Sequence, residues 1–206
     1  NHHKQANAFH IKVLCKNYAS LLKHPAFLAS TCIAGMAVAA TMVYATTSSF
    51  IFQDDFHLSP IQYGWICMAA SLGMVVGKLI TPLCIKHFTS HKTLFVGCML
   101  TALAGLWIII FNLHGHITLI LTIIAISITL FAQAFIATGT MPRALGPFHD
   151  KRGSAGALFG SFQMLVAFVA SAILGGYAHA GVMALGISYV ILGTIAVLMF
   201  VLFIKE

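Results

Sequence analysis

Long apolar stretches alternate with short polar ones along most of the chain. Six of the apolar stretches have the length and composition of a membrane-spanning helix, which needs about 20 mainly apolar residues. They cover residues 26–50, 61–85, 93–112, 117–141, 156–178 and 182–204. The pattern therefore predicts an all-α integral membrane domain of six transmembrane helices over residues 26–206.

Residues 1–25 precede the first span and show a different pattern. Ile11, Leu14 and Tyr18 fall on one arc of a helical wheel, and Lys12 and Lys16 fall opposite them. This distribution is typical of an amphipathic helix at a membrane interface, and we expect the segment to lie on the cytoplasmic leaflet. It lacks the apolar core and cleavage site of a signal peptide. The chain begins with Asn rather than Met, so we expect it to be part of a longer protein.

The basic residues indicate how the spans are oriented. Threading the six spans back and forth places all eleven Lys and Arg residues on one side of the membrane, while the loops at 53–60, 112–116 and 178–181 have none. Cytoplasmic loops carry an excess of Lys and Arg, so both termini are predicted to be cytoplasmic. The basic residues are Lys4, Lys12, Lys16, Lys23, Lys78, Lys86, Lys92, Arg143, Lys151, Arg152 and Lys205.

Composition excludes several classes of protein. A chain that is 60% hydrophobic and 7% charged, with a mean hydropathy of +0.96, has too few charged residues to cover a soluble globule. The net charge of +7 is explained by membrane topology and requires no nucleic-acid partner. No Cys/His ligand set, carboxylate pair, nucleophile with a base or phosphate-binding loop stands out, so we expect no metal, no cofactor and no enzymatic activity.

Polar residues are distributed unequally among the spans. The first, fourth and fifth spans carry amides and clustered hydroxyls, whereas the third and sixth are almost wholly apolar. Polar groups in hydrocarbon must find partners or face a wet cavity, so the first group is predicted to form the pathway walls and the second to face lipid. A single Ser or Thr usually bonds its own helix. The predicted substrate-binding residues are Tyr44, Ser48, Gln133 and Gln163; for the two amides, holding helices together is the alternative.

Two GxxxG pairs predict close helix packing. Gly73 and Gly77 lie in the second span, and Gly156 and Gly160 lie in the fifth. Small residues four apart share a helix face and let another backbone approach, so both pairs are interpreted as packing or gating surfaces. Lys78 follows the first pair and is the ionisable residue that lies deepest in a span. It is assigned to the same gating region, with its side chain expected to extend toward the cytoplasmic interface.

Three segments resemble the Bcr/CflA group of drug-resistance transporters in the major facilitator superfamily. Ser48–Gln53, Leu58–Pro60 and Tyr63–Gly64 resemble the end of that group's seventh helix, the outer loop and the start of its eighth helix. Pro142–Phe148, with Ala155–Leu158 and Gly160–Gln163, resembles the loop from the tenth helix into the eleventh, and Tyr18–Lys23 resembles the end of the central loop. The chain is therefore identified as similar to the C-terminal half of a twelve-helix transporter.

The resemblance implies a function and a partner. A proton-coupled multidrug antiporter of the bacterial inner membrane would export small amphipathic compounds, with an N-terminal six-helix half as partner. Asp54, Asp55, Asp150 and Glu206 lie in loops or at the terminus, so the proton site is expected in that other half. Thr81 and Pro82 stand where the superfamily's gating motif would have an Asp-Arg pair.

Other functions remain open at this stage. The same fold could belong to an uptake transporter or to an exporter of metabolites or siderophores. A non-transporting membrane assembly module and a half-size protein that dimerises into a transporter are further alternatives.

Overall fold

The computed structural model describes residues 21, 24–148, 152–176 and 181–204. The amphipathic helix predicted in residues 1–25 lies almost entirely outside this range and stays a prediction. The described residues form α2 (Pro25–Ser49), which continues as the π-helix η2 (Phe50–Asp55), then α3 (Pro60–His87), α4 (Ser90–Leu113), α5 (Leu119–Leu145), α6 (Arg152–Gly175) and α7 (Gly181–Phe203). Within them there is no strand. All six long helices could cross a bilayer, which confirms the predicted all-α membrane fold.

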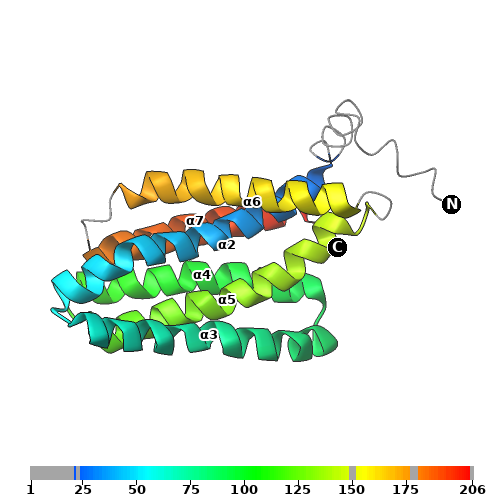
Figure 1. Ribbon diagram of the computed structural model, residues 1–206. Coiled ribbons are helices and arrows are strands. Elements are labelled where there is room, and N and C mark those ends of the chain that lie inside the picture. The colour runs from blue at the N-terminus through cyan, green and yellow to red at the C-terminus, as the bar shows by residue number, and fades with distance from the viewer. Residues whose placement is uncertain (1–20, 22–23, 149–151, 177–180, 205–206) are drawn as a thin grey trace.

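The helices form a bundle with two outlying members. Figure 1 shows α6 along one margin and α3 along the other, with α2 and α5 between them and α4 and α7 behind. In agreement, α6 packs mainly against α2 and α3 mainly against α5, while α4 packs against both α5 and α7.

Local sequence explains where several helices begin. Pro25 and Pro60 occupy the first turns of α2 and α3, where the missing N–H has no intrahelical acceptor. At α3, the Ser59 hydroxyl accepts from the Gln62 N–H at 3.4 Å, and the Gln62 side chain accepts from the Ser59 N–H at 2.9 Å. This reciprocal pair is a capping box, which fixes the start of the helix after the outer loop.

Two helices run further than the sequence predicted. The first span was expected to end at residue 50, but the chain stays helical to Asp55 as a six-residue π-helix. The loop before the fifth span was expected to begin at Arg143, but α5 continues through Pro142 to Leu145. A proline inside a helix removes one hydrogen bond, here the bond to the Thr138 carbonyl, and the turns on either side hold the helix together.

Glycine allows the closest helix approaches. A Cβ on Gly77 of α3 would lie 2.8 Å from the Phe131 carbonyl oxygen of α5, and a Cβ on Gly73 would clash with the Ser127 carbonyl one turn away. A second such contact joins α4 to α7, where a Cβ on Gly105 would lie 2.6 Å from the Val190 nitrogen. The sequence analysis identified the first glycine pair and missed the second contact, because its glycines lie on two helices and match no local motif.

Apart from Lys78, the described charged residues lie toward the ends of the bundle. Lys86, Lys92 and Arg152 lie at the ends of α3, α4 and α6 on the side where α2 begins. Asp54 and Asp55 lie in η2 at the other end. This separation agrees with the one-sided distribution expected from the sequence, and the side of the membrane each end occupies stays a prediction.

Exposure differs among the helices. The most exposed are α3 and α6, in which an 18-residue apolar stretch is only 17% and 11% buried, and the lipid-facing role expected of the third and sixth spans stays a prediction. The corresponding values for α4 and α7 are 39% and 44%, because these two helices pack along each other. The outward side chains of α4 and α7, such as Leu103, Ile110 and Leu198, are still apolar and suited to lipid.

Candidate functional site

A cavity of about 220 Å³ lies among four helices of the bundle. Larger hollows of about 570 and 410 Å³ have mostly apolar linings that suit lipid chains, and two others of about 460 and 440 Å³ lie at the ends of the helices. The lining of the first cavity comes from α2, α3, α5 and α6 and includes four polar side chains among small and aliphatic ones. The lining residues are Ala34, Ala37, Val38, Met74, Lys78, Gln133, Ala134, Ile136, Ala137, Thr138 and Gln163.

The cavity lies near the middle of the helices. At 1.5 Å per residue, Gln133 is about 21 Å from the start of α5 and Gln163 about 17 Å from the start of α6. Lys78 is about 14 Å from the end of α3 at His87. A polar side chain at this depth is costly to bury in hydrocarbon when it has no partner. Polar side chains at this depth need a protein partner, water or a ligand.

The amides and the lysine are incompletely hydrogen-bonded. The Gln133 Nε2 donates to the Ala37 carbonyl of α2 at 3.4 Å. Neither Lys78 nor Gln163 has a side-chain hydrogen bond to any residue in the described part of the chain. Thr138 bonds the Ala134 carbonyl of its own helix at 2.7 Å. The cavity thus presents donors and acceptors that the described helices leave available.

Two prolines interrupt the backbone hydrogen bonding of helices that line the cavity. Pro82 stands four residues after Lys78, and Pro142 stands four residues after Thr138. A proline has no N–H to donate to the carbonyl four residues earlier, so the carbonyls of Lys78 and Thr138 lose their usual helical partners. Both freed carbonyls belong to residues that line the cavity.

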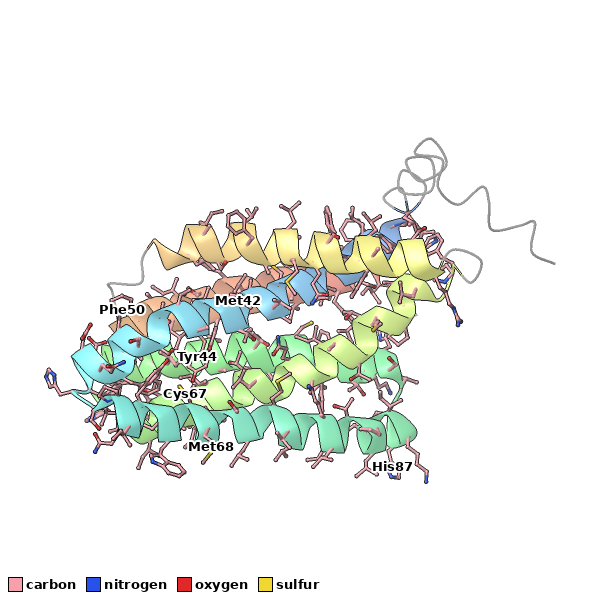
Figure 2. All side chains as sticks on the ribbon, viewed as in Figure 1. Met42, Tyr44, Phe50, Cys67, Met68 and His87 are labelled. Carbon is pink, nitrogen blue, oxygen red and sulfur yellow. The ribbon has the colours of Figure 1, made fainter. Side chains whose placement is uncertain are left out.

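Tyr44 and Ser48 lie elsewhere, in a contact between α2 and α3. The Tyr44 hydroxyl donates to the Cys67 Sγ at 3.5 Å, and the Ser48 Oγ lies 2.8 Å from the Tyr63 hydroxyl. Figure 2 shows Tyr44 on α2 turned toward Cys67 on α3. Both predicted residues are almost fully buried, Ser48 with only 1% of its surface exposed. The structure thus separates the four predicted substrate-binding residues into a cavity pair, Gln133 and Gln163, and a helix-contact pair.

The hydroxyls of the spans mostly follow the expected local pattern. Thr47, Thr129 and Thr140 each bond the carbonyl four residues earlier, at 2.8, 3.1 and 2.8 Å. These bonds satisfy the hydroxyls without a ligand. The cluster of hydroxyls in the first span therefore gives little support to a site there.

The predicted packing residues also divide into two groups. Gly73 and Gly77 contact the α5 backbone, whereas no heavy atom lies within 4 Å of a Cβ built on Gly156 or Gly160 of α6. The open space beside Gly156 and Gly160 lies on one of the two most exposed helices. The partner predicted for this pair therefore stays a prediction.

One wall of the cavity, α3, is not among those expected from the sequence. The sequence predicts walls in the first, fourth and fifth spans and a gating role for Lys78. The structure instead puts Lys78 and Met74 in the cavity lining. One signal could have shown this: a lysine well inside a span and a proline four residues later both introduce polarity that an apolar helix avoids.

The chemistry of the cavity lining is simple. Among the residues that the structure describes, no group of three His, Cys, Asp or Glu side chains could hold a metal ion. The cavity itself has one cation, two amides, one hydroxyl and apolar walls. Such a lining suits the recognition of a small molecule with a polar group and an apolar body.

Comparison with known proteins places the chain among membrane transporters. The sequence model of the Major Facilitator Superfamily matches residues 24–206. The chain is also similar to an uncharacterized MFS-type transporter, YdgK, of Bacillus subtilis (strain 168), with 24% identity over 163 residues. That match covers 78% of this chain but only 40% of the relative. The chain thus spans less than half the length of the transporter it matches.

Proposed function

The chain belongs to the major facilitator superfamily, and from this we propose that it forms the C-terminal six-helix half of a transporter that moves small amphipathic compounds across the membrane. The observation that carries the proposal is the mid-membrane cavity with Lys78, Gln133 and Gln163 on three different helices. Alternating access in such transporters takes place by rocking of two halves around a central site.

The proposed partner is an N-terminal six-helix half. The match to only 40% of a relative supports it, as does the exposure of α3 and α6, which have apolar side chains and few neighbours. Proton-coupled efflux is the proposed mode, in keeping with the resemblance to the Bcr/CflA group. The carboxylate that would bind the proton is assigned to the other half, because the described acidic residues, Asp54 and Asp55, lie in η2 at one end of the bundle.

The proposed location is the bacterial inner membrane with both termini in the cytoplasm. The clustering of Lys86, Lys92 and Arg152 at one end of the bundle supports this orientation.

Transport by the full-length protein that carries this chain tests the proposal. We expect proteoliposomes to take up compounds from a panel of neutral, cationic and anionic amphipathic molecules when a pH gradient is imposed, and to stop when a protonophore collapses it. Liposomes without protein are the control for passive leak. Flux that does not depend on the pH gradient would support transport by the protein and contradict proton coupling. No flux of any panel compound would favour a non-transporting membrane module.

A further inference from the structure

The cavity has a positive charge that the described part of the chain does not neutralise. Lys78 is the one ionisable side chain in its lining. The described carboxylates, Asp54 and Asp55, precede the start of α3 at Pro60, and Lys78 lies about 27 Å of helix beyond that start. Lys78 is exposed on the described chain, and an ammonium group at this depth of a membrane domain would gain from an anion close to it.

The neighbours of Lys78 complete a site for one anionic group. Gln133 and Gln163 line the same cavity from α5 and α6, and a primary amide can donate N–H bonds to an oxyanion. Ala34, Ala37 and Ala137 leave room beside these groups because their side chains are short. Met74, Val38 and Ile136 supply apolar contact for the rest of a ligand. The amide of Gln163 has no hydrogen-bond partner in the described chain and is available for this purpose.

We propose that the compound bound in this cavity carries a carboxylate or a similar anionic group, which Lys78 binds as an ion pair with the two amides beside it. This inference rests on the proposed function and names its class of substrate. Charge-assisted hydrogen bonds of this kind are stronger than neutral ones. Lipophilic cations are disfavoured in the same cavity, because a second positive charge would be held near Lys78 without a described carboxylate to offset it.

Binding of a matched pair of probes tests this assignment. The full-length protein is placed in lipid nanodiscs, and the dissociation constants of 2-naphthoate and 2-naphthamide are measured at neutral pH. The two probes share the same ring system and differ in charge. We expect the wild-type protein to bind 2-naphthoate more tightly. Lys78→Gln should weaken 2-naphthoate binding about 10- to 100-fold and leave 2-naphthamide binding nearly unchanged.

Two further variants separate a local effect from a general one. Lys78→Arg keeps the charge and should retain the preference for 2-naphthoate. Lys92→Gln removes a positive charge from the first turn of α4, outside the cavity, and should leave both dissociation constants unchanged. Equal binding of the two probes by the wild-type protein, or no binding of either, would overturn the inference. So would an unchanged preference in Lys78→Gln, which is the result expected if a carboxylate from another segment neutralises Lys78.

The outcome is distinguishable from the outcome of the transport experiment. If the protein transports neutral or cationic compounds but shows no preference for 2-naphthoate, the proposed function is supported and the anionic substrate class is contradicted. If the protein binds 2-naphthoate through Lys78 but transports none of the panel compounds, the anion site is supported and the proposed function is contradicted.

Discussion

Replacing Gln133 and Gln163 together with Leu is expected to lower transport by the full-length protein about 5- to 100-fold in kcat/KM. Each amide is assigned a hydrogen bond to the substrate, and a net hydrogen bond contributes about 0.5–1.5 kcal/mol. Leu has nearly the same volume, so the packing of the cavity walls should be retained. The one protein bond removed is the 3.4 Å contact from Gln133 to the Ala37 carbonyl. Initial rates in proteoliposomes measure the effect.

The control for this variant is Gln53→Leu. Gln53 lies in η2, outside the cavity, and its side-chain amide donates to the Ser49 hydroxyl at 2.8 Å. Gln53→Leu is therefore the same chemical change at a position away from the cavity. We expect its transport rate to match that of the wild-type protein. If the double variant transports every substrate at the wild-type rate and folds normally, Gln133 and Gln163 hold helices together and take no part in the pathway.

The second large effect is expected for Gly73→Val in α3. A Cβ at this position would clash with the Ser127 carbonyl of α5, and neither backbone can move without separating the two helices. Overpacking of this kind lowers the free energy of unfolding by about 1–3 kcal/mol. We expect a lower temperature of thermal unfolding in detergent and a smaller fraction of monodisperse protein.

Gly64→Val is the matched control for that variant. Gly64 lies in the same helix, and no heavy atom lies within 4 Å of a Cβ built on it. Gly64→Val and Gly73→Val make the same change in helix propensity, because both replace Gly with Val in α3. Only Gly73→Val adds the clash with α5. Equal loss of stability in the two variants would show that helix propensity, and not contact between α3 and α5, accounts for the effect.

The fold could be predicted from the sequence because the bilayer imposes it. A spanning segment must satisfy its backbone internally and be apolar for about 20 residues, so composition and length alone indicate the helices. The residues at which the helices end were harder to predict. The π-helical extension to Asp55 and the passage of α5 through Pro142 depend on tertiary packing, which propensity does not encode.

The candidate site was predicted in part, and the reason differs for each residue. Gln133 and Gln163 stood out because an amide in an apolar helix needs a partner, and the structure brings both to one cavity. Tyr44 and Ser48 have the same polarity but are paired across α2 and α3. Lys78 was assigned to gating, because sequence gives the depth of a residue in a span and not the direction in which its helix face points.

The small residues show the same limit. Gly73 and Gly77 share one helix face, so their spacing predicted a close neighbour. Gly105 of α4 meets α7 near Gly186, and a contact between residues 81 positions apart leaves no periodic signal in either helix. Long-range packing of this kind is set by how all six helices fit together.

The central claim is that substrate enters the cavity formed by α2, α3, α5 and α6. The most direct measurement uses Thr138→Cys in a full-length protein whose native cysteines have been replaced, and follows its labelling by a water-soluble maleimide. Thr138 lines the cavity, whereas Leu103 of α4 is half-exposed on the apolar outer surface and provides a control variant, Leu103→Cys. We predict that Thr138→Cys is labelled, that a transported compound slows its labelling, and that Leu103→Cys is not labelled. Failure of the reagent to reach Thr138→Cys, or labelling that no transported compound slows, would contradict the claim.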